Sequence, residues 1–356
     1  MITIILGTRP EIIKMAPVIR ECEKKGVEYE ILHTGQHYSY DMDRTFFEQL
    51  ELPEVDHNLD VGSGSHGEQT GKILAGIERV LMNGDTDEVL VQGDTNTVMA
   101  GALAASKLHI RVGHVEAGLR SFDRRMPEEI NRVVADHISD HLFAPTENSR
   151  RLLLDEGIKD ENIEVVGNTI VDSVHQNLKI AMKKVDPLVD LDLKRENFIL
   201  MTSHRAENVD VKSRFEGIME GARSVSEDLG MKVVYPIHPR ARKFLDRFNI
   251  DTDGIEVIDP VGFLEFLVLE SSARLVLTDS GGVQEETCIL NTPCITLRDN
   301  TERPETIEVG ANLLAGTDPS AIKRKAIQQT NAKNEWKNPF GDGTSAEKII
   351  RISSNQ

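Results

Sequence analysis

The sequence predicts an α/β fold with two doubly wound, Rossmann-like domains, each built on a parallel sheet. Short apolar, β-branched runs alternate with segments of helical period along the whole chain, which is typical of βα units. The chain has 356 residues, more than a single hydrophobic core usually supports, so two domains are expected. A polar, acidic stretch at residues 183–197 separates two series of strands and is interpreted as the connection.

The first series of elements fills the N-terminal half. Its first strand leads directly into Gly7 without a preceding basic segment, so it is interpreted as a buried strand and not as a signal peptide. The expected strands are residues 2–6, 29–33, 88–91, 112–115, 142–144 and 163–166. The expected helices include residues 11–25, 71–81, 97–108 and 127–137, the last with proline at its first position.

The second series repeats this pattern after residue 197. We expect domains at residues 1–182 and 183–356, with a helix between the domains and a last helix that could pack back on the first domain. The expected strands are residues 198–202, 233–237, 255–258, 275–278 and 294–297. The expected helices include residues 211–225, 263–270 and 283–290.

Composition limits the classes of function. No stretch approaches the roughly 20 apolar residues of a membrane span, and the three cysteines form no CxxC pair, so we expect a cytoplasmic protein without a membrane partner. The net charge of −18 disfavours binding to nucleic acid. The eleven histidines are scattered without metal-ligand spacing, so no metal is expected. The glycine-rich residues 62–67 lack a GK[ST] motif and are interpreted as a mobile loop.

Polar residues follow most of the predicted strands. Open α/β sheets bind ligands at the carboxyl ends of their strands, so we expect a ligand in a cleft between the two domains. The segments concerned are residues 7–11 (GTRPE), 92–96 (QGDTN), 116–120 (EAGLR), 203–207 (SHRAE), 238–240 (HPR), 279–282 (DSGG) and 298–304 (RDNTERP).

Two of these segments suit phosphate binding. Residues 280–282 open a helix and could present backbone N–H groups to a diphosphate, with Glu286 one turn further on for ribose hydroxyls. The alternative is an ordinary turn capped by the Ser280 hydroxyl. Arg9 could reach a phosphate, while Lys14 either lines the cleft or forms an exposed ion pair with Glu11.

Basic and acidic groups are divided between the domains. His204, Arg205, His238 and Arg303 follow strands of the second domain and could stabilise a departing diphosphate. The first domain offers carboxylates suited to general acid–base catalysis, namely Asp94, Glu116, Glu128 and Glu129. The alternatives are that Asp94 caps the helix that starts near residue 97, and that Glu128 and Glu129 only complement a helix dipole.

Seven strings in chain order resemble the non-hydrolysing UDP-N-acetylglucosamine 2-epimerases. They are residues 7–11, 92–95, 114–120 (HVEAGLR), 127–132 (PEEINR), 203–205, 278–286 and 298–305, and the likeness continues to residues 338–343 (NPFGDG). The resemblance implies a glycosyltransferase-B-like homodimer that interconverts UDP-N-acetylglucosamine and UDP-N-acetylmannosamine without NAD or metal. The reaction of this family proceeds by elimination of UDP to a 2-acetamidoglucal, followed by re-addition.

The resemblance also implies roles for individual residues. The acid–base carboxylates are Asp94, Glu116 and Glu128, among which the base for the C2 proton stays unassigned, and His204 assists the departing UDP. The expected contacts to the nucleotide are Arg9, Lys14, Phe266, Ser280, Gly281, Gly282, Glu286 and Arg303. Val261 stands where relatives place a glutamine against the base.

Many bacterial members bind a second UDP-N-acetylglucosamine as an activator. Gln36, His37, Arg205 and His238 match parts of that site, whereas Ser39 and residues 62–67 depart from it, so altered or absent activation is expected. The alternative functions are a hydrolysing 2-epimerase, a glycosyltransferase and a UDP-sugar-binding regulator without catalysis. The low aromatic content, 4%, disfavours the acceptor groove of a glycosyltransferase.

Overall fold

The computed structural model describes residues 1–36 and 40–354, and only the backbone of residues 40–42. The chain divides into two compact units. The first unit comprises Met1–Gln176 and Phe340–Gln356, and the second unit comprises Asn177–Pro339. Among the described residues, none of the helices is long and apolar enough to cross a membrane.

The first unit is built on a parallel sheet. Its seven described strands lie in the order β3-β2-β1-β4-β5-β6-β7. The strands are β1 (Ile2–Leu6), β2 (Tyr29–His33), β3 (His57–Asn58), β4 (Glu88–Gln92), β5 (Arg111–Val115), β6 (His141–Ala144) and β7 (Ile163–Val165). The helices are α1 (Arg9–Lys25), α2 (Tyr40–Gln49), α3 (His66–Leu81), α4 (Asn96–Lys107), α5 (Pro127–Ile138), α6 (Glu147–Asp155), α7 (Thr169–Lys184), which continues into the second unit, and α16 (Ser345–Ser354), with a 3₁₀ turn at Asp160–Asn162.

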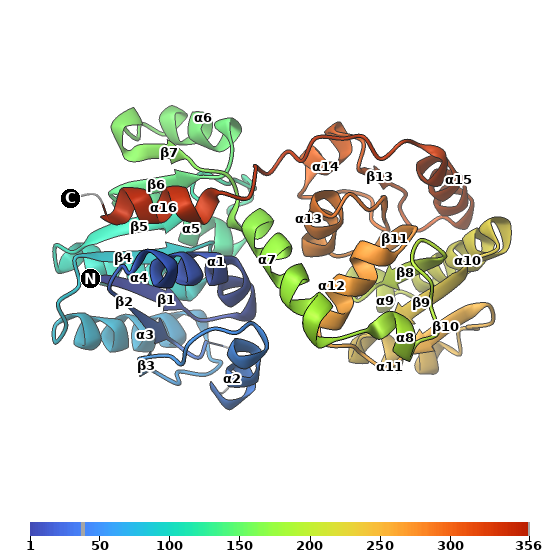
Figure 1. Cartoon of the computed structure of the whole chain (residues 1–356), viewed down its shortest axis with the longest axis horizontal. Coiled ribbons are helices and arrows are strands. Elements are labelled where there is room, and N and C mark those ends of the chain that lie inside the picture. Colours follow the sequence, from blue (N-terminus) through green and yellow to red (C-terminus); the bar gives the residue numbers. More distant parts are fainter. Residues whose placement is uncertain (37–39, 355–356) are drawn as a thin grey trace. The chain divides into compact units, whose positions relative to one another are not determined.

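Alternate residues of each strand point to opposite faces of the sheet, and helices bury the apolar side chains on both faces. Ile5, Val89 and Val91 pack with α3 and α4 in one core cluster. The C-terminal helix α16 lies beside α1, although more than 300 residues separate them in sequence (Figure 1). Ile12 and Ile349, on these two helices, are both fully buried. The first unit is therefore completed by a helix that follows the second unit in the chain.

The second unit repeats this architecture. Its six described strands lie in the parallel order β10-β9-β8-β11-β12-β13. The strands are β8 (Phe198–Thr202), β9 (Lys232–Pro236), β10 (Ile255–Ile258), β11 (Leu275–Thr278), β12 (Cys294–Thr296) and β13 (Asn312–Leu314). The helices are α8 (Pro187–Asp190), α9 (Ala206–Val209), α10 (Lys212–Leu229), α11 (Pro239–Phe248), α12 (Phe263–Ser272), α13 (Gly281–Ile289), α14 (Pro304–Glu308) and α15 (Pro319–Asn331).

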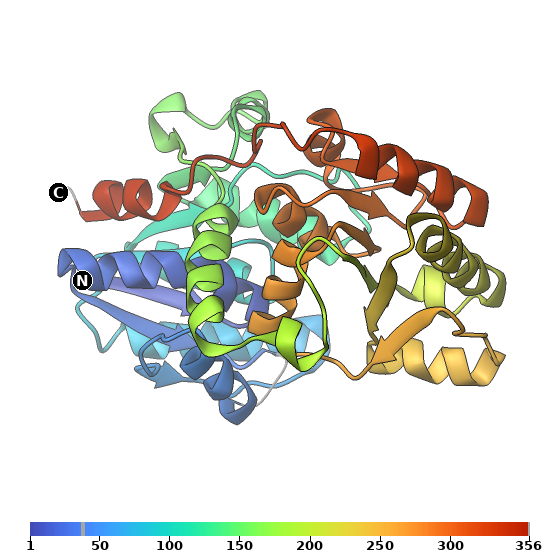
Figure 2. The same cartoon turned by 45° about the vertical axis from the view of Figure 1, so that its right-hand side comes forward.

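The two faces of the second sheet have separate cores. Ile199 and Met201 of β8 pack in one cluster with residues of α10 and α15. These two helices run side by side (Figure 2). Phe198 and Leu200 point the other way and pack with residues of α12 and α13. Alternation along one strand thus supplies both cores.

The predicted fold class is confirmed, since both sheets are parallel and doubly wound. The strand order reverses between β1 and β4 in the first unit and between β8 and β11 in the second, and such reversals are where ligands bind in open α/β sheets. Two strands were not predicted, β3 and β13. The loop predicted for residues 62–67 is wrong at its last two residues, because α3 begins at His66.

Candidate active site

The reversal point of the first sheet holds a buried ion pair. Glu116 follows β5 in a left-handed conformation, with φ of 72°. The ammonium of Lys14, on α1, lies 2.8 and 2.7 Å from its two carboxylate oxygens, and Gln92 donates to the second oxygen. The side chains of Lys14 and Glu116 are only 15% and 6% exposed. Lys14 therefore orients a catalytic candidate, and the alternative of an exposed pair with Glu11 is wrong.

Glu11 instead joins the turns after β1 and β4. It completes a capping box with Thr8, and its carboxylate accepts hydrogen bonds from the backbone of Gly7 and Thr8. The Thr95 hydroxyl donates to its other oxygen at 2.6 Å. Burial raises the pKa of Glu11 to about 7, against the opposing effect of these hydrogen bonds. The two strand ends on either side of the reversal point are thus held together.

Asp94 belongs to an ion-pair network and does not cap a helix. Its carboxylate pairs with Arg132 of α5, which also lies 2.8 Å from Glu129. Thr95 occupies the N-cap of α4 and accepts from the backbone of Val98, so the capping alternative for Asp94 is wrong.

The neighbouring acids Glu128 and Glu129 have different environments. Glu129 is buried and accepts from the backbone of Ser121 and Phe122. Burial disfavours its charge, but these hydrogen bonds and Arg132 outweigh burial and lower the pKa of Glu129. Glu129 therefore holds the loop that leads into α5. Glu128 lies exposed in the first turn of that helix.

The remaining candidates of the first unit lie around the turn after β2. Arg9 opens α1, and its Nε lies 3.3 Å from Asp43. The buried Gln36 accepts from the backbone N–H and the hydroxyl of Thr97 at 3.0 and 2.7 Å. Gln36 thus fixes the start of α4. His37 and Ser39 lie outside the described residues.

Asp279 organises the reversal point of the second sheet. This carboxylate is fully buried and accepts from the Ser203 hydroxyl, the backbone N–H groups of His204 and Arg205, and the Asn208 amide at 2.8 to 3.1 Å. Nδ1 of His204 lies 3.2 Å away. Burial disfavours the charge, but these partners outweigh burial and lower the pKa of Asp279. In the sequence Asp279 is only the first residue of the DSGG segment, and no local pattern indicates this role.

His204 and His238 converge, as their positions after neighbouring strands suggested. Their ring centroids are 5.7 Å apart. His238 also caps α11, because its Nδ1 accepts from the backbone of Arg240 at 3.1 Å. Burial and the charges of His204 and Arg240 lower the pKa of His238. The His238 ring is thus held at the start of α11, next to His204.

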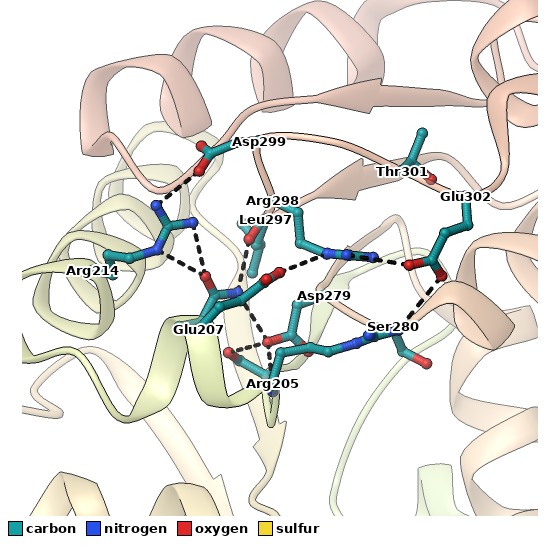
Figure 3. Close-up of polar contacts among 12 residues, drawn as sticks. Arg205, Glu207, Arg214, Asp279, Ser280, Leu297, Arg298, Asp299, Thr301 and Glu302 are labelled. Carbon is teal, nitrogen blue, oxygen red and sulfur yellow. Dashed lines mark hydrogen bonds and ion pairs between the residues drawn. The ribbon is translucent and has the colours of Figure 1, made fainter. Parts of the chain in front are cut away.

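Carboxylates accompany the arginines at the ends of β8 and β12, as Figure 3 shows for Arg205, Glu302 and Arg298. The Glu302 carboxylate lies 3.8 Å from Arg205 and 3.4 Å from Arg298. Arg303 lies 2.6 Å from Glu285. The Glu302 side chain is 51% exposed, so its pairs are weak and an incoming anion could displace them. The sequence did not indicate these acidic partners.

The segment predicted to bind phosphate lies at the start of α13. Ser280 occupies the N-cap, but its hydroxyl makes no capping hydrogen bond with any residue that the structure describes, so the hydroxyl-cap alternative is wrong. A Cβ on Gly281 or Gly282 would meet its first neighbour at 3.8 or 3.9 Å. The backbone at both glycines is thus accessible to a ligand. Phe266 of α12 and Val261 are both partly buried and pack against the same core cluster.

Glu286, on α13, neighbours an unexpected buried acid. Glu270 of α12 is fully buried and lies within hydrogen-bond reach of Glu286. Burial and the charge of Glu286 raise the pKa of Glu270 well above its ordinary value. The raised pKa favours the protonated form of Glu270 beside Glu286, the residue expected to bind ribose.

We expect Glu270→Gln to change how stability depends on pH. The raised pKa means that the native state binds this proton more tightly than the unfolded chain does. Its contribution is therefore present below the ordinary pKa and is lost as pH rises through the folded pKa. The free energy of unfolding is measured by urea denaturation at about pH 5 and about pH 9. Relative to the unsubstituted protein, the variant should be more stable at pH 9 than at pH 5, by ~1 kcal/mol or more. Parallel pH profiles would contradict a protonated Glu270.

Comparisons with known proteins agree over nearly the whole chain. A family model described as UDP-N-acetylglucosamine 2-epimerase matches residues 20–354. A protein of that name from Methanocaldococcus jannaschii is 57% identical over 358 residues, which cover 99% of this chain and 98% of the relative. A solved structure of the M. jannaschii UDP-GlcNAc 2-epimerase in complex with UDP-GlcNAc and UDP has a TM-score of 0.85 at 56% identity, covering 100% of this chain and 99% of that one. A Pseudomonas aeruginosa UDP-2,3-diacetamido-2,3-dideoxy-D-glucuronate 2-epimerase is 43% identical over 90% of each chain.

Proposed function

Because the chain belongs to the UDP-N-acetylglucosamine 2-epimerase family, we propose that it interconverts UDP-N-acetylglucosamine and UDP-N-acetylmannosamine without hydrolysis. The observation that carries this proposal is the chemistry at the two reversal points. The first has the oriented carboxylate Glu116, and the second has His204 held by Asp279 beside an open helix N-terminus. A proton acceptor and a diphosphate site are what epimerisation by elimination requires.

In the proposed reaction a carboxylate of the first unit removes the C2 proton while the bond between C1 and the UDP oxygen breaks. The electron pair of the C–H bond becomes the C1–C2 double bond of 2-acetamidoglucal, and UDP leaves as an anion. UDP then adds back to C1 while a proton is delivered to the opposite face of C2. We assign Glu116 as one of the two proton-transfer groups because Lys14 and Gln92 fix both of its oxygens. Asp94 and Glu128 are the candidates for the other.

The second unit supplies the groups for UDP in this proposal. The start of α13, with Ser280, Gly281 and Gly282, would receive the diphosphate. His204, oriented by Asp279, would assist its departure, and Arg205 and Arg303 would neutralise its charge. Glu286 would bind ribose, and Phe266 would line the uracil region. The product would serve the synthesis of cell-surface polysaccharide or glycan precursors.

Proton NMR in D2O tests the proposed function. Incubation with UDP-N-acetylglucosamine should give a mixture of both UDP-sugars with deuterium at C2 of each. Release of free N-acetylmannosamine would indicate hydrolysis, and an unchanged substrate would leave a glycosyltransferase or a regulator. A parallel incubation with UDP-2,3-diacetamido-2,3-dideoxyglucuronate tests the substrate of the more distant Pseudomonas relative. We expect slower exchange there, in line with its lower identity.

We also propose that activation by a second UDP-N-acetylglucosamine is altered or absent. The reason is that Ser39 and residues 62–67 depart from the activator site of the bacterial members. Reaction of pure UDP-N-acetylmannosamine should therefore start without a lag, and a trace of UDP-N-acetylglucosamine should leave the initial rate within about twofold. A long lag that the trace removes would contradict this expectation.

A further inference from the structure

A buried histidine of the first unit has acceptors at both of its ring nitrogens. His114 lies on β5 and is 0% exposed. Its Nδ1 is 2.6 Å from Asp136, and its Nε2 is 2.8 Å from the carbonyl oxygen of Gly93. A carbonyl oxygen only accepts, and a neutral imidazole donates through one nitrogen only. If Asp136 is ionised, both bonds form together only when His114 is an imidazolium cation.

The surroundings of Asp136 require it to be ionised. Its second carboxylate oxygen lies 2.7 Å from the Arg120 guanidinium and accepts from the backbone N–H of Gly118 at 3.2 Å. Burial disfavours this charge, but His114 and Arg120 outweigh burial and lower the pKa of Asp136. Arg120 is balanced in turn by Glu156 at 2.6 Å. Asp136 is therefore an acceptor at every bond described.

The His114–Asp136 pair contacts all the segments that carry the candidate carboxylates of the first unit. Gly93, which accepts from His114, directly precedes Asp94. Glu116 lies in the turn between His114 and Gly118, both of which bond to Asp136. Asp136 itself is on α5, the helix that bears Glu128 in its first turn.

We propose that His114 is a positioning residue, a buried imidazolium that holds the turns of Asp94 and Glu116 and the helix of Glu128 in one arrangement for proton transfer at C2. This inference rests on the proposed function, because it assumes that these carboxylates move the proton. The charged groups that face His114 are Asp136 from α5 and Glu116 from the turn after β5. Burial disfavours the cation, but Asp136, the Gly93 carbonyl and Glu116 outweigh burial and raise the pKa of His114.

The protonation state can be tested in the unsubstituted enzyme. With 15N-labelled histidine, both ring nitrogens of His114 should carry the imidazolium signature at about pH 8, where an ordinary histidine with a pKa of about 6.5 is neutral. Asp136→Asn should shift the titration of His114 to lower pH. A neutral ring in the unsubstituted enzyme at about pH 7 would overturn the proposal.

Kinetics test the positioning role. His114→Gln should lower kcat by about 10²-fold, with KM and the Kd for UDP within about twofold, because most of the groups assigned to UDP belong to the second unit. The double variant His114→Gln with Asp136→Asn should have a kcat no lower than that of the slower single variant, because the two side chains hold the segments through one shared interaction. His141→Gln is the matched control, because His141 also pairs with a carboxylate, that of Glu88 at 2.9 Å. These two residues begin β6 and β4, at the end of the sheet away from the candidate carboxylates. It should retain full kcat.

Two outcomes of the kinetic test would overturn the inference. One is an unchanged kcat in His114→Gln. The other is a double variant whose loss of kcat equals the product of the losses in the two single variants. Failure of the proposed function is a separate result. In that case the unsubstituted enzyme incorporates no deuterium at C2, while His114 still shows the imidazolium signature.

Discussion

Glu116→Gln is expected to lower the rate of deuterium incorporation at C2 of UDP-N-acetylglucosamine by about 10²–10⁴-fold, the usual contribution of a general acid or base. Glutamine keeps the shape of the side chain but cannot accept a proton. The substitution also leaves the Lys14 ammonium without its carboxylate partner, so some loss of stability should accompany the loss of activity. The rate is measured by proton NMR in D2O.

UDP binding separates a catalytic loss from unfolding in this variant. The Kd for UDP should change by no more than about twofold, since the residues assigned to UDP lie mainly in the second unit. Glu147→Gln is the control, because Glu147 is 76% exposed in a surface pair with Arg150. Full exchange activity in Glu116→Gln would defeat the proposed role of this carboxylate.

Asp279→Asn should destabilise the protein by about 3 kcal/mol and weaken binding of UDP. The amide nitrogen of asparagine would face donors in place of an acceptor oxygen, and His204 would lose the charge that orients it. Urea denaturation gives the stability, and titration calorimetry gives the Kd for UDP. Asp228→Asn, which removes an exposed pair with Lys323, should change the free energy of unfolding by less than about 1 kcal/mol.

The destabilisation by Asp279→Asn should depend on pH with a definite sign. The pKa of Asp279 is lowered in the folded state, so its contribution is present above the ordinary aspartate pKa of about 3.9 and is lost as pH falls through the folded value. The difference between the unsubstituted protein and the variant should therefore shrink in acid. A difference that grows as pH falls would contradict an ionised Asp279.

Local patterns were sufficient to predict most of the fold. Every predicted strand overlaps an observed one, because each is a short apolar run buried in a parallel sheet. The edge strands β3 and β13 escaped prediction because they are two and three residues long and include His57, Asn58 and Asn312. Backbone pairing with β2 and β12 makes them strands, and that pairing has no local pattern in the sequence.

The positions of the candidate residues after strands were predictable, but their partners were not. Turns after strands placed Asp94, Glu116 and His204 at the reversal points. The partner of Glu116, Lys14, is 102 positions away in the sequence, and Asp279 is 75 positions from His204. The choice between Glu128 and Glu129 also depends on the fold, because burial of one acid follows from how α5 docks. Such pairings arise only once the sheet has brought distant turns together.

The place of α16 has a consequence for how the protein is synthesised. The ribosome releases all of the second unit before this helix, which packs beside α1 of the first unit. Part of the apolar surface of α1 therefore stays uncovered until residues 345–354 emerge. We therefore expect nascent chains stalled at about residue 340 to depend on chaperones, and chains in which residues 345–354 have emerged to depend on them less.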